Sequence, residues 1–157
     1  MKMVEEILLV EDSPGDADLT IQALRQENMV DNVAIAHDGE EALDYLFCRG
    51  QFAGRSFDHP PRLVLLDLKL PKASGIEMLR QVKQDQRTKA IAVVILTSSK
   101  EEEDLMDTYN LGANSYIQKP GDIEQFREIV KRLGRYWLVV NQSPVANGER
   151  AKGAGQP

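Results

Sequence analysis

Residues 63–71, Leu-Val-Leu-Leu-Asp-Leu-Lys-Leu-Pro, decide how this chain folds. The four consecutive apolar residues are typical of a strand buried on both faces of a parallel sheet, and that strand ends at Asp67. Open α/β sheets form their binding crevices at the carboxyl ends of their strands. Asp67 is therefore the leading candidate for a functional residue, although an aspartate at a strand end can also serve only the turn that follows.

Other apolar runs predict four further strands, and helical patterns lie between them. The strands are expected at residues 7–10, 32–36, 90–96 and 115–117. Helices are expected at residues 16–27, 38–47, from 75 onward, 101–110 and 122–140. Strands that alternate with helices predict right-handed crossovers and a parallel sheet covered by helices on both faces.

The chain has 157 residues, which fits one domain with a sizeable core. We expect this domain to span residues 1–140. Residues 141–157 are rich in Pro, Gly and small polar residues without periodicity, so they are expected to form a disordered tail. Residues 48–61 lack periodicity and are longer than a usual helix-to-strand connection, so they predict a surface excursion.

Composition excludes several classes of partner. The net charge of -6 argues against binding of nucleic acid, which needs a clustered basic surface. Cys48 is the only cysteine, so an internal disulfide and a Cys-based zinc site are both excluded. The sequence has no signal-peptide pattern and no apolar run long enough to cross a membrane, so a cytoplasmic location is expected.

Five polar side chains are expected at the same edge of the predicted sheet. They follow or end the strands: Glu11, Asp12, Asp67, Thr97 and Lys119. Carboxylates without His or Cys suit a hard cation that keeps several waters, which describes Mg²⁺ better than zinc. A divalent cation and a lysine ammonium would also offset the repulsion between three crowded carboxylates.

The same group of residues suits phosphoryl transfer. A carboxylate can attack a phosphoryl group and become an aspartyl-phosphate, and Asp67 fits this nucleophile. Lys119 would pair with a phosphoryl oxygen, and the hydroxyl of Thr97 could donate a hydrogen bond to the new phosphoryl group. For the metal, Asp12 would be a direct ligand, Glu11 would bind through water, and the carbonyl of Lys69 could add a backbone ligand.

The chain resembles a receiver domain of a two-component response regulator, of the chemotaxis-type single-domain kind, over about residues 7–140. The residues that carry the resemblance are Glu11-Asp12, Asp67 with Pro71 and Gly75, Thr97-Ser98, Tyr116 and Lys119-Pro120. The resemblance implies a flavodoxin-like fold with strand order 2-1-3-4-5. It also implies phosphotransfer from the phosphohistidine of a sensor histidine kinase to Asp67. Such a domain is a phosphoacceptor rather than an enzyme acting on other molecules.

Three finer expectations come from the same resemblance. Tyr116 occupies the aromatic switch position and is expected to turn inward as Thr97 moves toward the phosphoryl group. The Lys119–Pro120 peptide bond is expected to be cis. The switch is expected to be read by an unknown downstream protein on the surface formed by residues 101–110, 115–117 and 122–140.

Within the family, residues 48–61 and the Tyr136-Trp137-Leu138 segment resemble the regulators paired with bacterial phytochrome histidine kinases. A phytochrome is therefore one expected kinase partner. The apolar run from Tyr136 to Val139 predicts an exposed patch and self-association. We expect a homodimer through the same surface that reads out the switch.

Three alternative functions fit the sequence less well. An aspartyl-phosphate hydrolase needs a second acid shortly after its nucleophile, whereas Lys69 stands two residues after Asp67. A nucleotide-binding protein would carry a glycine-rich motif after its first strand, and none is present. A third alternative, a pseudo-receiver that binds partners without phosphate, is opposed by the intact acids and lysine.

Overall fold

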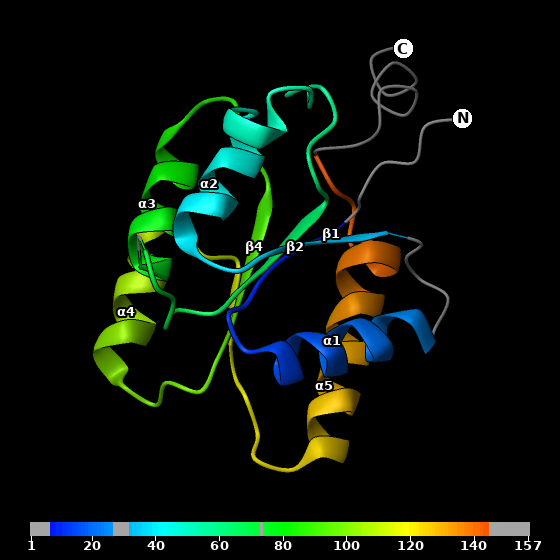
Figure 1. The fold of residues 1–157 in the computed structure, drawn as a ribbon. Coiled ribbons are helices and arrows are strands. Elements are labelled where there is room, and N and C mark those ends of the chain that lie inside the picture. The colour runs from blue at the N-terminus through cyan, green and yellow to red at the C-terminus, as the bar shows by residue number, and fades with distance from the viewer. Residues whose placement is uncertain (1–6, 27–31, 73, 145–157) are drawn as a thin grey trace.

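The computed structural model describes residues 7–26, 32–72 and 74–144. Its strands form one parallel sheet with the order β2-β1-β3-β4-β5, as predicted. The strands are β1 (Ile7–Val10), β2 (Val33–Ala36), β3 (Leu63–Leu66), β4 (Ala92–Thr97) and β5 (Ser115–Gln118). Figure 1 shows the twisted sheet between two layers of helices, which is the flavodoxin-like arrangement.

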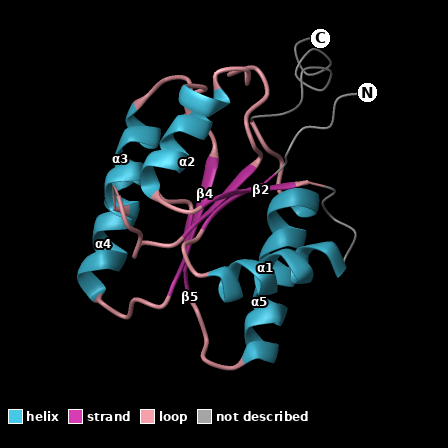
Figure 2. Cartoon of the chain, in the orientation of Figure 1, coloured by secondary structure: helices cyan, strands magenta, loops and turns pink. Residues whose placement is uncertain are grey.

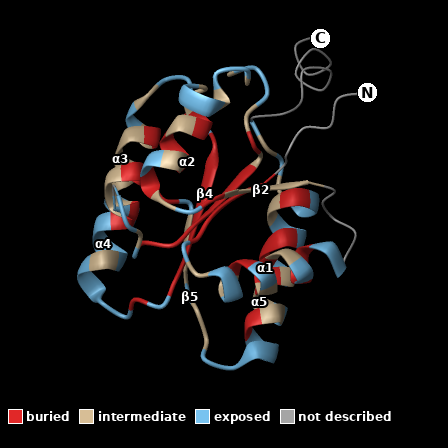
Figure 3. Ribbon diagram, in the orientation of Figure 1, coloured by how far each residue is buried: buried red, intermediate tan, exposed pale blue. Residues whose placement is uncertain are grey.

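Two helices cover one face of the sheet and three cover the other (Figures 1 and 2). The first layer contains α1 (Pro14–Gln26) and α5 (Ile123–Arg135). The second layer contains α2 (Gly39–Leu46), α3 (Gly75–Gln84) and α4 (Glu102–Leu111). Alternate residues of each strand supply the two cores: Leu8 and Val10 face α2 and α3, whereas Ile7 and Leu9 face α1 and α5. The central strands are therefore buried on both faces, as Figure 3 shows in red.

Side-chain caps fix where several helices begin. Asp38 accepts a hydrogen bond from the backbone N–H of Glu41 at the start of α2, and Ser74 caps α3 in the same way. Asp122 accepts from the first backbone N–H groups of α5, which confirms the predicted cap. Because these caps lie at the carboxyl edge of the sheet or beside it, they also fix the loops that carry the candidate site.

Residues 48–61 form an excursion that packs back on α2. It contains the short 3-10 helix η1 (Gly50–Phe52), and Arg55 holds it by stacking its guanidinium 3.6 Å from the ring centre of Tyr45. Arg55 also donates hydrogen bonds to the carbonyls of Tyr45 and His59. The excursion leads into the start of β3, so it lies at the opposite end of that strand from Asp67.

The end of α5 differs in part from the prediction. The helix continues as a π-helical turn, η2 (Tyr136–Val140), which confirms the expected end at residue 140. The run from Tyr136 to Val139 is not one exposed patch, because Leu138 is 6% exposed and Trp137 packs against the core. Helical periodicity turns these two side chains inward and leaves Tyr136, Val139 and Val140 exposed.

Of the tail predicted at residues 141–157, residues 145–157 lie outside the described part, as does Glu27 at the predicted end of the first helix. Within the described ranges, no helix is both long enough and apolar enough to cross a bilayer.

Candidate functional site

The parallel register brings residues from four strand ends to one edge of the sheet. Hydrogen bonds continue one residue beyond the strands: Asp67 N–H donates to the carbonyl of Val10, and Lys119 N–H donates to that of Thr97. Glu11 is aligned in the same way, because its N–H bonds to a β2 carbonyl. β1 and β3 therefore end level with each other, β4 and β5 run two residues further, and the side chains at these ends converge.

Three carboxylates gather at this edge. Oxygen atoms of Glu11, Asp12 and Asp67 all lie within 4.8 Å of one another, with Glu11 and Asp67 buried and Asp12 exposed. Among the described residues this is the one such group of potential ligands, and it contains neither sulfur nor imidazole. An all-oxygen set that is open on the Asp12 side fits a hard divalent cation with bound waters. The predicted role of the Lys69 carbonyl stays a prediction.

The ammonium of Lys119 lies among carboxylates. Its Nζ atom is 2.6 Å from Glu11 Oε1, 3.1 Å from Asp67 Oδ2 and 2.8 Å from Asp16 Oδ2. The side chain of Lys119 is only 8% exposed. The sequence predicted Glu11, Asp67 and Lys119 together but missed Asp16, because an acid in the first turn of a helix is usually explained by the helix dipole.

Charge and burial act against each other in this cluster. Burial raises the pKa of Glu11 from 4.5 to about 7, although the hydrogen bond and the charge of Lys119 oppose the change. Burial by itself would lower the pKa of Lys119, but the hydrogen bonds that Lys119 donates to Asp16 and Glu11 outweigh it and raise that pKa. At Glu11 the cost of burying the charge therefore outweighs the attraction of the Lys119 ammonium.

Asp67 is held by contacts on both carboxylate oxygens. Its Oδ1 atom accepts a hydrogen bond from Thr97 Oγ1 at 2.9 Å and from the backbone N–H of Lys69 at 3.1 Å. Its Oδ2 atom accepts from Lys119. Asp67 is 7% exposed and Thr97 is fully buried, so these contacts fix the orientation of the carboxylate.

Tyr116 is linked to the loop that follows Thr97. Its hydroxyl donates to the carbonyl of Ser99 at 3.2 Å, and its ring is half-buried. The hydroxyl of Ser99 donates to Asp104 of α4 at 2.5 Å and accepts from the N–H of Glu101. A chain of contacts therefore runs from Tyr116 through Ser99, two residues after β4, to the first turn of α4.

The start of α3 lies against the end of β3. A Cβ atom added at Gly75 would lie 2.7 Å from the carbonyl oxygen of Asp67 and 2.7 Å from the Cα of Leu68. Both atoms belong to the backbone, so neither can move without displacing the strand end. Gly75 is one of the residues that carry the resemblance, and this close approach explains why the position requires glycine.

One prediction for the site is wrong. No described peptide bond is cis, so the bond between Lys119 and Pro120 is trans. The difference in free energy between the two isomers before proline is only about 0.5–1 kcal/mol, so a proline at a strand end does not by itself fix the cis form. Lys119 reaches the carboxylates with this bond in the trans form.

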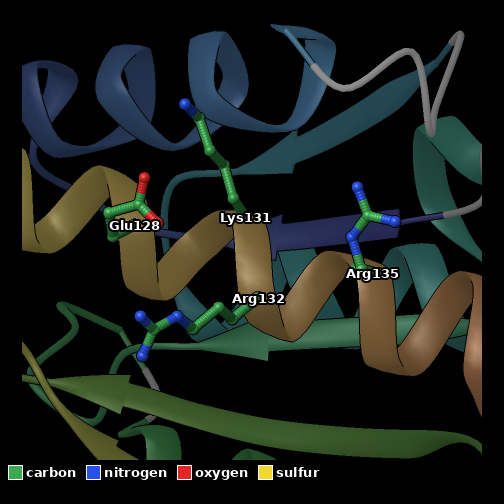
Figure 4. A pocket seen from close by; sticks show the side chains of 4 residues that line it. All are labelled: Glu128, Lys131, Arg132 and Arg135. Atoms are coloured by element: carbon green, nitrogen blue, oxygen red, sulfur yellow. The ribbon is translucent and has the colours of Figure 1, made fainter.

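A hollow lies on α5, away from the acidic edge (Figure 4). It is lined by Glu128, Lys131, Arg132 and Arg135, which share one helical face. The lining is mostly basic in a chain of net charge -6. None of the residues expected at the acidic edge contributes to it.

Comparisons with curated proteins identify relatives of similar length. The probable methanogenesis regulatory protein FilR2 of Methanothrix harundinacea is 42% identical over 138 residues, which cover 88% of this chain and 86% of that protein. Response regulator Rcp1 of Synechocystis is 35% identical over 140 residues, which cover 89% of this chain and 93% of Rcp1.

Solved structures are similar over the same length. The phosphorylated cyanobacterial phytochrome response regulator RcpA has a TM-score of 0.84 at 38% identity and covers 90% of this chain and 99% of its own. The Mn²⁺-bound form of Rcp1 has a TM-score of 0.82 at 35% identity, over 88% of this chain and 97% of Rcp1. The bacteriophytochrome response regulator AtBRR is 44% identical with a TM-score of 0.69, over 90% of this chain and 100% of its own.

The family comparison agrees with the fold and the acidic edge. Residues 7–131 match the response regulator receiver domain. This match covers well over half of the chain, and it includes every residue predicted for the site. The protein therefore belongs to the family of response regulator receiver domains.

Proposed function

We propose that this protein accepts a phosphoryl group on Asp67 from the phosphohistidine of a sensor histidine kinase and signals through protein contacts. The observation that carries the proposal is the position of the Asp67 carboxylate between Thr97 on one oxygen and Lys119 on the other. In the transfer, the N–P bond of the phosphohistidine breaks and an O–P bond forms to Asp67. The imidazole nitrogen keeps the electron pair of the broken bond and is protonated from solvent.

The residues of this chain have separate roles in that step. Asp67 is oriented by three hydrogen bonds before phosphate arrives, so little reorganisation is needed for attack. Lys119 supplies a positive charge for the incoming phosphoryl oxygens, and Thr97 supplies a hydroxyl donor. Glu11, Asp12 and Asp67 would hold Mg²⁺, which when bound supplies positive charge to the transferring oxygens.

The switch would run from Thr97 to α4. When Thr97 turns to a phosphoryl oxygen, the loop through Ser99 moves with it, and Tyr116 and Asp104 are the residues bound to that loop. Tyr116 is half-buried in β5, and β5 contacts α4. An unknown downstream protein would read the change on the surface of α4, β5 and α5.

We further propose a phytochrome histidine kinase as the phosphodonor, in the cytoplasm, with residues 1–140 acting as one receiver unit. Support comes from similarity to solved regulators whose names contain phytochrome, over nearly the whole of their length. A phosphotransfer profile against the histidine kinases of the source organism tests this partner. Fastest transfer from a kinase that is not a phytochrome would reject it.

The phosphoacceptor is tested with a small phosphodonor and Mg²⁺. Intact-mass measurement is expected to show the gain of one phosphoryl group, lost on mild alkaline or hydroxylamine treatment. Asp67→Ala should show no gain, whereas the exposed acid variant Asp58→Ala should react as the native protein does. Equal modification of Asp67→Ala would reject the assignment and revive the pseudo-receiver alternative.

Self-association through α4, β5 and α5 is also proposed. The support is a group of exposed apolar side chains on α4 and at the start of α5: Leu105, Met106, Tyr109 and Ile123. Burying them between two copies would remove apolar surface from water. Sedimentation of the native protein should show a dimer that Met106→Glu weakens and Gln84→Glu, on α3, does not. A native monomer at high concentration, with and without phosphoryl mimic, would reject this interface.

A further inference from the structure

Every N–H donor of the Lys119 ammonium is already in use. A lysine ammonium has three N–H donors, and Nζ lies within 3.1 Å of three carboxylates, those of Glu11, Asp16 and Asp67. The side chain is 8% exposed, so solvent adds little. A phosphoryl oxygen on Asp67 can therefore bind Lys119 only if one of these contacts is given up.

The three contacts are not equivalent. Glu11 and Asp67 belong to the group of carboxylates that fits a divalent cation, and Asp16 does not. If Glu11 and Asp67 held a divalent cation, Asp16 would remain as the competitor for the ammonium. Asp16 is also the most accessible of the three acids, with 39% of its side chain exposed against 4% for Glu11.

The backbone of Asp16 is fixed in the first turn of α1. Its N–H donates to Ser13 Oγ at 3.4 Å, and its carbonyl accepts from the buried hydroxyl of Thr20 at 2.8 Å. An acid at this position commonly bonds to the free N–H groups of its own helix. Here the carboxylate contacts Lys119 instead, which is a contact across 103 residues of sequence.

We propose that Asp16 is a positioning residue that holds the ammonium of Lys119 on the α1 side of the site and competes there with the phosphoryl group on Asp67. The inference rests on the proposed phosphoacceptor function, and it adds that Asp16 regulates how tightly the site binds the phosphoryl group. Asp16 thereby lowers the affinity of the site for the phosphoryl group while its negative charge favours the divalent cation. The two affinities should respond in opposite directions when the charge of Asp16 is removed.

Asp16→Asn tests the proposal through two binding constants of the full chain. With Mg²⁺ saturating, beryllofluoride, a phosphoryl mimic, should bind about threefold more tightly, because Lys119 is released from a partly exposed ion pair. Without beryllofluoride, Mg²⁺ alone should bind about threefold more weakly, because one negative charge is lost beside the cation. Calorimetry measures both constants.

Two further variants distinguish a positioning role of Asp16 from a general effect of its charge and from an effect on folding. Asp16→Glu keeps the carboxylate and should restore both native constants. Asp18→Asn removes the same charge from an exposed position of the same helix and should change beryllofluoride affinity little. If Asp16→Asn weakens both ligands and lowers the melting temperature, Asp16 is only a structural ion-pair partner and the proposal fails.

The role of Asp16 and the phosphoacceptor role of Asp67 can fail independently, and the two failures give different binding results. If the native protein binds beryllofluoride and Asp67→Ala does not, the phosphoacceptor site stands. Asp16→Asn with native affinity for both ligands then overturns the role of Asp16 alone. If the native protein with Mg²⁺ binds no beryllofluoride, both are overturned.

Discussion

The hydroxyl of Thr97 donates a hydrogen bond of 2.9 Å to Asp67 Oδ1, joining the ends of β4 and β3 at the centre of the site. Both side chains are buried, so the contact is shielded from water. Thr97→Val keeps the shape of the side chain and removes the donor. Because a hydrogen bond to a charged group contributes about 1.5–3 kcal/mol, beryllofluoride should bind at least about tenfold more weakly.

Thr97→Ser is the matched control, since it keeps the hydroxyl and loses a methyl group. Calorimetric titration with beryllofluoride and Mg²⁺ should show weakening mainly for the valine variant. Equal affinity for Thr97→Val and native protein would mean that the threonine hydroxyl does not contact the phosphoryl group.

Asp67→Asn should stabilise the metal-free protein. The substitution removes one of several crowded carboxylates, while Lys119 keeps its contacts to Glu11 and Asp16. We expect the free energy of unfolding to rise by about 1 kcal/mol, which corresponds to a rise in melting temperature of about 3 °C. Thermal unfolding in the presence of a chelator measures this change. An unchanged or lower value would show that Lys119 already neutralises the cluster.

Glu11 should make metal-free stability depend on pH. Its folded-state pKa of about 7 lies above the ordinary value of 4.5, so between these pH values the folded protein holds a proton that the unfolded chain has lost. Stability is therefore highest below the unfolded pKa and falls as pH rises to about 7, by about 3 kcal/mol in all.

Glu11→Gln cannot titrate and should lack this fall. The free energy of unfolding of both proteins, measured in chelator from pH 4.5 to 8, gives the effect as a difference. Parallel curves for the two proteins would show that burial does not raise the pKa of Glu11.

Gly75→Ala should destabilise the protein although alanine is the better helix former. The added Cβ would meet backbone atoms of Asp67 and Leu68 at 2.7 Å, so strand and helix must separate. We expect the free energy of unfolding to fall by about 2 kcal/mol, and Asp67 to be modified more slowly by a small phosphodonor. Denaturant unfolding and intact-mass kinetics measure the two effects.

Gly15→Ala is the control for helix propensity. Gly15 lies in the first turn of α1, and a Cβ there would meet nothing within 4 Å. This variant should be as stable as the native protein or slightly more stable. If both alanine variants behave alike, the close approach of α3 to β3 is not what requires glycine at position 75.

The sequence was sufficient to predict the sheet and most of the site. Runs such as residues 63–66 are buried on both faces, and such runs are typical of parallel sheets covered by helices. Once strands alternate with helices, the chain must bring Glu11, Asp67, Thr97 and Lys119 to one edge. Their convergence therefore follows from topology rather than from details of packing.

Other features could not be predicted because they depend on packing in three dimensions. Asp16 has the ordinary pattern of an acid in a first helical turn, and only the path of Lys119 gives it a partner. The cis and trans forms of the Lys119–Pro120 bond differ little in energy, so the residue types alone do not decide between them. Whether Leu138 faces water or core depends on how α5 continues into η2.

The excursion at residues 48–61 suggests a practical position for a reporter. It joins β3 at Leu63, four residues and roughly 13 Å along the strand from Asp67, and a Cβ at Gly54 would meet nothing within 4 Å. A fluorophore or short tag attached beside Gly54 would stand clear of the acidic edge and of α4. The location and amount of the protein in the living cell could then be followed optically without altering the chemistry at Asp67.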